Sequence, residues 1–381
     1  MSLVKHIYQG TYLLIIGVVM QQVSIVLPTF KEKENINILF NEIRNKINLR
    51  GYEVLVVDDN SPDKTWAEAL NNIGEYDVVV KRINMKGLSS AVIDGVLFSL
   101  GGYVVVMDAD LQHPPEVVNN MFEKIKNDCY EIIVGSRYMH GGGVIGWSKI
   151  RLLTSKGATL IAKILLPYAR KISDPMSGFF MVKKELIEKN KDKLDPMGFK
   201  ILLEILEKCR PNKVAEVPYV FRSRYYGKSK LGTKTIIDFI IHVLKLSGWR
   251  PLKFSAVGLT GVLVNLFMLW FIGAIYPLLV RSFFALGSAI AIEVSILWNF
   301  IVHEVWTFRD RRADSLVKRL TIFHIATSPG ALAQYISAIS VRYGLSFNPF
   351  IAQLVGIIVG FPVNYIVSEL GVWKTYRASE T

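Results

Sequence analysis

Four long stretches of low charge in the second half of this sequence constrain its fold most strongly. Residues 254–280, 320–341 and 343–368 contain no Lys, Arg, Asp or Glu, and residues 282–302 contain only Glu293. A helix needs about 20 apolar residues to cross a bilayer, where its backbone must be paired internally. The sequence therefore predicts an all-α, four-helix transmembrane domain, comprising residues 253–375 with spans at about 254–275, 282–303, 320–341 and 349–369.

Basic clusters beside these stretches predict an orientation in the membrane. Arg250 and Lys253 flank the first stretch, the loop TFRDRRADSLVKRL follows the second, and the chain has a formal net charge of +13. Because short basic loops remain in the cytoplasm, we expect a multi-pass cell-membrane protein with its N-terminal half and both termini cytoplasmic. The charge lies beside the spans and the sequence has no recognisable nucleic-acid module, so we expect membrane lipids and no nucleic acid as partners.

The first half of the chain has the pattern of an α/β domain. Short β-branched and aliphatic runs alternate with amphipathic stretches, and Ser61-Pro62 is typical of a helix start. This alternation predicts a Rossmann-like, mostly parallel sheet covered on both faces. We expect strands at 23–29, 53–57, 77–83, 103–107 and 131–135, and helices at 34–48, 62–73, 88–100 and 115–127.

Segments of different character border this domain, which we place at residues 21–232. Residues 1–20 are apolar but too short to span a bilayer. We interpret them as a leader preceding a natural start at Met20, with a membrane-surface anchor as the alternative. Residues 233–252 form a linker. Within it, 235–249 has the spacing of an amphipathic helix, which either lies in the membrane interface or packs on the sheet.

Carboxylates follow two of the predicted strands. Asp58 and Asp59 end the second, and Asp108 and Asp110 follow the fourth, with Gln112 two residues further on. Ligands of parallel sheets bind beyond the carboxyl ends of the strands. Carboxylate and amide oxygens suit Mg²⁺ or Mn²⁺, which would leave positions for phosphate oxygens. The sequence therefore predicts a divalent-cation site formed by Asp108, Asp110 and Gln112.

Seven motifs resemble those of a known family: VSIVLPTFKEKENI, VLVVDDNSPDKT, KGLSSAVIDG, VVMDADLQHPPE, IIVGSRY, SDPMSGFF and RYYGKSKL. Residues 23–232 are similar to family-2 glycosyltransferases of GT-A fold, and most similar to dolichol-phosphate mannose synthases and related polyprenyl-phosphate glycosyltransferases. The tail resembles a GtrA-like membrane domain. The resemblance implies a GT-A catalytic domain, a nucleotide sugar such as GDP-mannose as donor, Mg²⁺ or Mn²⁺, and dolichyl or polyprenyl phosphate as acceptor.

The resemblance also implies roles at the donor. Asp58 or Asp59 would read the base or ribose, and the metal ligands would hold the diphosphate. The resemblance favours Arg224 and Lys230 for neutralising the leaving diphosphate. Arg222 and Lys228 are close enough in sequence to take that role instead. Phe30 and Lys31 stand where the family has Tyr and Asn, which keeps stacking but loses a phenolic hydrogen bond. The implied donor-site residues are Pro28, Phe30, Glu32, Asp58, Asp59, Asp108, Ala109, Asp110, Arg224 and Lys230.

The acceptor phosphate is assigned to Arg137, Arg151 and Ser155, because a guanidinium matches phosphate oxygens. The alternatives are an ion pair at a strand end for Arg137 and an exposed helix position for Arg151. The glycine run between them, HGGGVIGW (140–147), is interpreted as a mobile lid.

An acceptor phosphate is already anionic near neutral pH, so the expected reaction needs no general base. The metal ion, the cationic side chains and the positioning of the substrates would lower the activation barrier of the transfer. The residues expected to be catalytic are Asp110, Arg137, Arg151 and Ser155. A single displacement inverts the anomeric centre and gives dolichyl β-D-mannosyl phosphate. The alternatives are a polyprenyl-phosphate glucosyltransferase that uses UDP-glucose and an inactive protein that binds or flips the lipid carrier.

Overall fold

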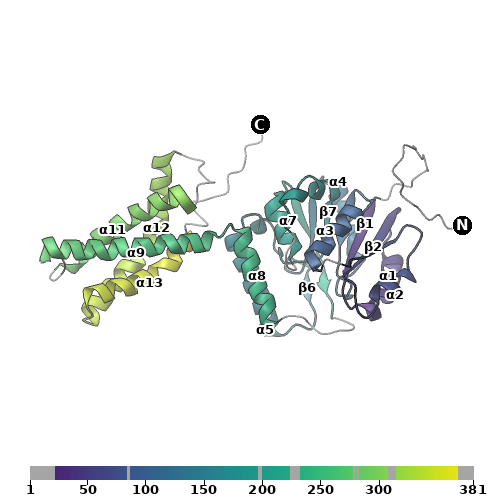
Figure 1. Cartoon of the computed structure of the whole chain (residues 1–381), viewed down its shortest axis with the longest axis horizontal. Helices are drawn as coiled ribbons and strands as arrows, with labels where there is room; N and C mark the ends of the chain where they lie inside the picture. Colours follow the sequence, from purple (N-terminus) through teal and green to yellow (C-terminus); the bar gives the residue numbers. More distant parts are fainter. Residues whose placement is uncertain are drawn as a thin grey trace. The chain divides into compact units, whose positions relative to one another are not determined.

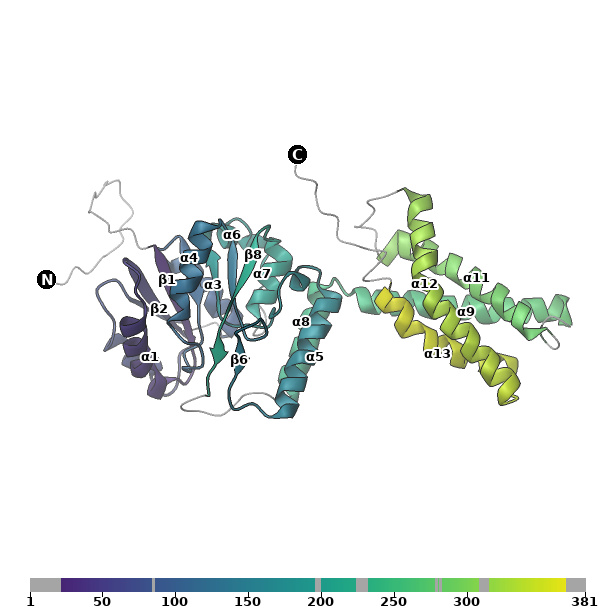
Figure 2. The same ribbon diagram turned by 180° about the vertical axis from the view of Figure 1, so that it is seen from behind.

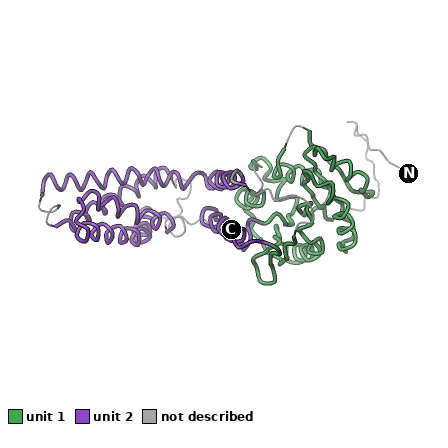
Figure 3. The backbone as a smooth tube through the Cα atoms, turned by 90° about the horizontal axis from the view of Figure 1, so that it is seen from below, with its two compact units in different colours: residues 1–146, 177–229 green, residues 147–176, 230–381 purple. Residues whose placement is uncertain are grey.

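The computed structural model describes residues 22–83, 86–195, 200–223, 232–277, 280, 283–307 and 315–367. It divides into two compact units, coloured separately in Figure 3: residues 1–146 with 177–229, and residues 147–176 with 230–381. Residues 147–176 fall within the predicted domain 21–232 but belong to the second unit.

A seven-stranded sheet forms the centre of the first unit, in the order β3-β2-β1-β4-β7-β5-β8. Only β7 runs antiparallel to its neighbours in this sheet. Helices lie on both sides of it (Figures 1 and 2), as the sequence predicts for a mostly parallel α/β domain. The strands are β1 (Val23–Thr29), β2 (Tyr52–Asp58), β3 (Val78–Lys81), β4 (Tyr103–Val106), β5 (Ile132–Ser136), β7 (Phe180–Lys183) and β8 (Val214–Pro218).

The central strands are apolar on both faces because helices cover both faces. Every residue of β1 is buried, and the register pairs Val23 with Tyr52 at one end and Thr29 with Asp58 at the other. The carboxyl ends of β1 and β2 are therefore side by side. The helices of this unit are α1 (Lys33–Lys46), α2 (Thr65–Leu70), α3 (Leu88–Phe98), α4 (Val117–Asn127), α6 (Lys184–Glu188), η2 (Lys191–Lys193) and α7 (Ile201–Cys209).

The expected helix start at Ser61-Pro62 is wrong. Helix α2 begins only at Thr65, after Lys64 in the left-handed region with φ of 61°. The Ser61 hydroxyl lies 2.6 Å from a carboxylate oxygen of Asp58 and donates a hydrogen bond to it. Ser61 therefore closes the loop after β2 instead of capping a helix.

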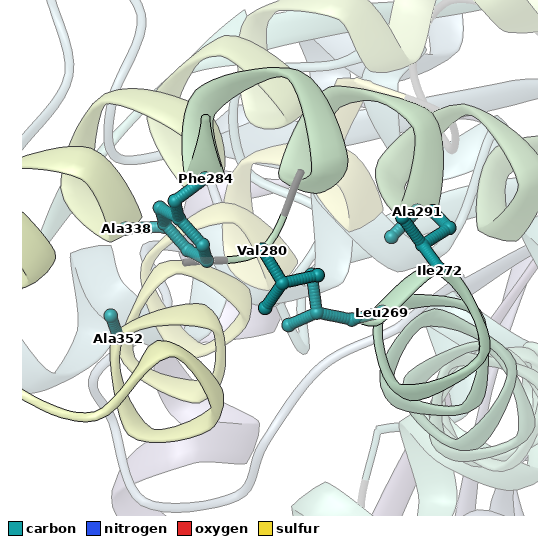
Figure 4. Close-up of a cluster of buried hydrophobic side chains, with 7 residues drawn as sticks. All are labelled: Leu269, Ile272, Val280, Phe284, Ala291, Ala338 and Ala352. Carbon is teal, nitrogen blue, oxygen red and sulfur yellow. The ribbon is translucent and has the colours of Figure 1, made fainter. Parts of the chain in front are cut away.

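The second unit is helical. Its elements are α5 (Lys149–Leu165), η1 (Tyr168–Lys171), α8 (Thr233–Leu246), α9 (Arg250–Ile275), α11 (Phe284–Val302), the π-helix η3 (His303–Thr307), α12 (Leu316–Ile339), the π-helix η4 (Ser340–Gly344) and α13 (Pro349–Val367). Helices α9, α11, α12 and α13 occupy the four predicted spans. Apolar side chains from all four helices and the segment between α9 and α11 form a common core (Figure 4), comprising Leu269, Ile272, Val280, Phe284, Ala291, Ala338 and Ala352.

Among the described residues, three helices are long and apolar enough to cross a membrane: Arg250–Ile275, Phe284–Thr307 and Pro349–Val367. Helix α12 is present where the third span is predicted. Its polar residues include Ser328 and Gln334, and Pro329 lies inside it. Gln334 is buried, so part of this polarity faces the bundle instead of lipid.

Candidate active site at the carboxyl ends of β1, β2 and β4

Asp58 holds the ends of β1 and β2 together. Its carboxylate accepts hydrogen bonds from Thr29 Oγ1 at 2.9 Å, from the Ser61 amide at 2.8 Å and from the Ser61 hydroxyl. The side chain is fully buried. Three donors from the protein thus engage this carboxylate, which shapes the loop that follows β2.

Asp59 points to a different partner, a buried arginine. Its Oδ1 lies 2.7 Å from Arg82 Nη1, and its Oδ2 accepts the Gly87 amide at 2.7 Å. Arg82 also pairs with Asp94, with 2.9 Å between Nε and Oδ2. This cluster joins the end of β2 to the start of α3. Arg82 was not predicted from the sequence. Its place near the end of a predicted strand, where a cation could pair with Asp58 or Asp59 at the end of the neighbouring strand, could have indicated it.

The segment after β1 is fixed by its backbone. Lys31 adopts the left-handed region with φ of 60°, and its amide donates to Ser61 Oγ at 3.0 Å. The Glu32 amide donates to Thr65 Oγ1, and Glu32 Oε2 accepts from Asn35 at 2.6 Å. Phe30 is half-buried, with Lys31 Nζ 5.6 Å from its ring centre. Pro28, in contrast, is buried within β1.

The two aspartates after β4 lie in a loop, because the strand ends at Val106. Leu111 has φ of 64°, which bends this loop sharply. Asp110 and Gln112 are each 5% exposed, and the backbone N–H of Gln112 donates to Asp110 Oδ1 at 3.2 Å. The Asp108 side chain is 37% exposed. Ala109 between the carboxylates is buried.

His113 supports the loop that carries Asp108 and Asp110 through a hydrogen bond to its backbone. Its Nδ1 accepts the Asp108 amide at 3.0 Å, so this nitrogen carries no proton. The ring stacks on Phe179 with 5.0 Å between centroids, and Tyr219 and Phe221 meet it edge-on. The aromatic cluster around His113 therefore orients the loop that carries Asp108.

The described residues contain no group of three His, Cys, Asp or Glu side chains that could hold a metal ion. The predicted ligand set consists of two carboxylates and one amide, Asp108, Asp110 and Gln112. The Gln112 Nε2 donates to the Arg222 carbonyl at 2.9 Å. With its nitrogen committed in this way, the amide oxygen is the atom of Gln112 suited to a cation. The chemistry of the set therefore fits a hard divalent ion completed by phosphate oxygens.

Arg222 is committed to the protein itself. Its guanidinium lies 3.1 Å from Glu42 and 2.6 Å from Glu116, and its amide donates to the Gln112 carbonyl. Arg222 therefore holds the loop that carries Gln112, and its guanidinium is already paired with two glutamates. The other predicted diphosphate cations, Arg224, Lys228 and Lys230, lie outside the described residues.

The predicted acceptor residues belong to different units. Arg137 follows β5 in the first unit, is 9% exposed, and has its guanidinium 5.4 Å from the centre of the Tyr138 ring. Arg151 and Ser155 lie one turn apart on α5 in the second unit, both half-buried. The Arg151 guanidinium is 4.3 Å from the Trp147 ring centre. The structure thus brings Arg151 and Ser155 onto adjacent turns.

The glycine run expected to form a lid is partly paired. Strand β6 (Gly143–Val144) pairs in parallel with β9 (Val220–Phe221). Gly142 packs so closely on the backbone of residues 136 and 137 that a Cβ there would lie 2.6 Å from the Ser136 carbonyl oxygen. The run therefore links the segment after β5 to the segment after β8.

Comparisons with known proteins cover most of the chain. A family model described as "Glycosyl transferase family 2" matches residues 24–190, and a second, "GtrA/DPMS, transmembrane domain", matches residues 253–373. A dolichol-phosphate mannosyltransferase of Pyrococcus furiosus is 44% identical over 361 residues, which cover 93% of this chain and 100% of that protein. A dolichol-phosphate mannosyltransferase of Saccharomyces cerevisiae is 38% identical and covers 58% of this chain and 86% of its own length.

Among solved structures, glucosyl-3-phosphoglycerate synthase from Mycobacterium tuberculosis, in complex with Mn²⁺, UDP and glucosyl-3-phosphoglycerate, matches with a TM-score of 0.47 and 18% identity. The match covers 60% of this chain and 80% of that one.

Proposed function

This chain belongs to the dolichol-phosphate mannosyltransferase family of glycosyltransferases, and from that premise we propose that it transfers mannose from GDP-mannose to dolichyl (polyprenyl) phosphate. The observation that carries the proposal is the 44% identity to a dolichol-phosphate mannosyltransferase along that protein's whole length. The catalytic and membrane family models both match, in that order. The protein is therefore a membrane-bound enzyme with a lipid-linked acceptor.

The donor is assigned to the edge of the sheet where β1, β2 and β4 end. The half-buried Phe30 ring would stack on the nucleotide, with Glu32 beside it. Asp108, Asp110 and Gln112 would hold Mg²⁺ or Mn²⁺, which supplies positive charge to the donor diphosphate. Arg224 and Lys230 are assigned to the same diphosphate. Because Asp58 and Asp59 are engaged by protein donors, we assign them to positioning the two loops that border the nucleotide.

The acceptor phosphate is assigned to Arg137, Arg151 and Ser155. Arg151 and Ser155, one turn apart on α5, can present a guanidinium and a hydroxyl to one phosphate. An oxygen of that phosphate attacks the anomeric carbon while the bond from this carbon to the GDP diphosphate breaks. The leaving diphosphate takes the electron pair. His113 is not needed as a base, and its Nδ1 is already occupied by the Asp108 amide.

The decisive experiment is transfer of radiolabel from GDP-mannose to a polyprenyl phosphate by the detergent-solubilised protein with Mn²⁺ or Mg²⁺. We expect a mild-acid-labile, β-linked lipid product that requires the metal. Asp110→Ala should abolish transfer, whereas the exposed matched change Asp128→Ala should not alter it. If label is transferred only from UDP-glucose, the donor is UDP-glucose and not GDP-mannose. An α-linked product would exclude a single displacement. No transfer from either donor would favour a protein that only binds the lipid carrier.

Helix α8 is proposed to lie in the membrane interface on the cytoplasmic side. One part of its exposed surface is apolar, with four isoleucines exposed between 43% and 51%, while Asp238 and Lys245 form an adjoining polar part. The apolar part consists of Ile236, Ile237, Ile240 and Ile241. An amphipathic helix of this kind buries its apolar face among lipid headgroups.

Spin labels test this placement of α8. With the exposed Cys129 replaced by Ser in each variant, a label on Ile240→Cys in liposomes should be more accessible to oxygen than to a water-soluble nickel complex, because oxygen concentrates in lipid. A label on Asp238→Cys of the same helix should show the opposite preference. Equal aqueous accessibility at both positions would instead indicate a helix that lies in water.

A further inference from the structure

Polar side chains link three membrane helices at the centre of the second unit. Ser288 of α11 donates to Gln353 Oε1 of α13 at 2.8 Å, and Gln353 Nε2 donates to Asn265 Oδ1 of α9 at 2.8 Å. Asn265 Nδ2 continues to Ser295 Oγ at 3.3 Å. All four residues are buried. This part of the bundle satisfies its own polar groups, as a helix bundle in lipid requires.

Two adjoining cavities lie in the same bundle, next to this chain of hydrogen bonds. Each has a volume of about 50 Å³, and Asn299 of α11 and Asn364 of α13 line both of them. Gln334 of α12 lines the first cavity, and His303 and Thr327 line the second. Both cavities therefore have polar side chains in their lining, although the lining of the second one is mostly apolar.

Three buried polar atoms at the cavities have no hydrogen-bond partner among the residues that the structure describes: Asn299 Oδ1, Gln334 Nε2 and Asn364 Oδ1. Gln334 is only 8% exposed. Leaving a buried donor or acceptor unpaired costs about 1–3 kcal/mol for each group. Two acceptors and one donor that line a common cavity match a ligand able to donate two hydrogen bonds and accept one.

We propose that these cavities are water-binding sites, with a water held by Asn299, Gln334 and Asn364. A buried water makes about three hydrogen bonds and occupies roughly 30 Å³, so a cavity of about 50 Å³ admits one or two. Sites for organic ligands are about 300 Å³ or larger, so cavities of about 50 Å³ suit water better than a sugar or a lipid headgroup. The inference is independent of the transfer reaction proposed above.

Glycines make room for the two asparagines. A Cβ at Gly261 of α9 would overlap the Asn299 side chain, and a Cβ at Gly330 of α12 would overlap that of Asn364. Both asparagine side chains therefore fit between the helices because the residue opposite each of them is a glycine. This explains how bulky amides reach the bundle interior without displacing the helices.

The test is water-edited solid-state NMR on the full-length protein in liposomes, with ¹⁵N-labelled glutamine. Gln353 provides the matched control, because it is also buried but its Nε2 already donates to Asn265. We expect magnetisation transfer from water to the Gln334 side-chain amide to be several-fold faster than transfer to that of Gln353. Gln334→Leu assigns the signal by removing it.

A second variant tests the role of Asn364. Asn364→Leu should lower the water transfer at Gln334 to the rate seen at Gln353, while Val359→Leu, on the exposed side of α13, should leave it unchanged. Transfer at Gln334 as slow as at Gln353 in the unmodified protein would overturn the proposal, whether or not the variants fold. Transfer from lipid acyl protons in place of water would also overturn it.

Discussion

At the scale of single residues, neighbouring carboxylates have different tasks. Asp58 closes the loop after β2 through Thr29 and Ser61, whereas Asp59 faces Arg82 and the Gly87 amide. Both are buried and bonded within the protein, so we expect a change of either to disturb the loops that border the proposed nucleotide site. Loss of stability and loss of donor affinity can therefore be separated by experiment.

Asp59→Asn should lower the free energy of unfolding by about 3 kcal/mol, because it removes one partner of a buried ion pair. The loss should stay near this value since Asp94 still pairs with Arg82. Urea titration followed by tryptophan fluorescence measures the change, with exposed Asp128→Asn as control. Weaker GDP binding with unchanged stability would show instead that Asp59 contacts the nucleotide directly.

The two cysteines should differ in reactivity. Burial raises the pKa of the Cys209 thiol from 9.0 to about 12, whereas Cys129 is exposed. Because the unfolded thiol ionises first, stability from the protonated Cys209 is complete below pH 9 and is lost between pH 9 and about 12. Cys209→Ala should weaken the dependence of unfolding on pH in this range.

Alkylation with iodoacetamide at pH 8 offers a direct check on the thiols. Mass spectrometry should find Cys129 modified and Cys209 protected until the protein is unfolded. Equal modification rates in the folded protein would contradict the burial of Cys209 and the direction of its pKa.

At the scale of elements, α12 and α13 pack through glycines. A Cβ at Gly360 would lie 2.6 Å from the Gly330 carbonyl oxygen and 3.0 Å from Gln334 Cβ, and a Cβ at Gly356 would overlap the Gln334 carbonyl oxygen. Small residues at such crossings let membrane helices approach closely and gain van der Waals contact. This helix contact is therefore sensitive to added volume.

Gly360→Ala should destabilise the membrane helices by about 1–3 kcal/mol, because the backbones must separate to admit the methyl group. Thermal unfolding in detergent measures the loss. Gly344→Ala is the matched control, since a Cβ at Gly344 meets nothing within 4 Å. An unchanged midpoint for the Gly360 variant would mean that α12 and α13 do not pack in this way.

At the scale of the whole molecule, the chain joins a sheet unit to a helical membrane unit. The basic segments flanking the apolar stretches predict that the sheet unit lies in the cytoplasm. This orientation would place the proposed donor site in the cytoplasm. The proposed acceptor residues of α5 belong to the unit that contains the membrane helices.

The native thiols test this orientation without substitution. A membrane-impermeant maleimide should label Cys129 in inverted membrane vesicles and leave it unlabelled in right-side-out vesicles, because Cys129 is the exposed thiol of the sheet unit. Detergent should restore labelling in the second case. Labelling of intact right-side-out vesicles would reverse the predicted topology.

Periodicity and composition in the sequence predicted the four spans and the strands β1 to β5, whereas β7, β8 and α5 were not predicted. Strand β1 occupies residues 23–29 as predicted, and helices fill all four predicted spans. The ordered motifs determined the enzyme family. These features are readable because alternation, helical spacing and apolar length are local properties of the chain.

The tertiary structure alone decided which side chains meet. Gln112 bonds to Arg222, 110 residues away, and Asp59 bonds to Arg82 just after the end of the neighbouring strand. Ser61 binds Asp58 instead of capping a helix, and His113 becomes the support of the aspartate loop. A buried polar group takes whichever partner the fold brings within about 3 Å, and that choice depends on contacts distant in sequence.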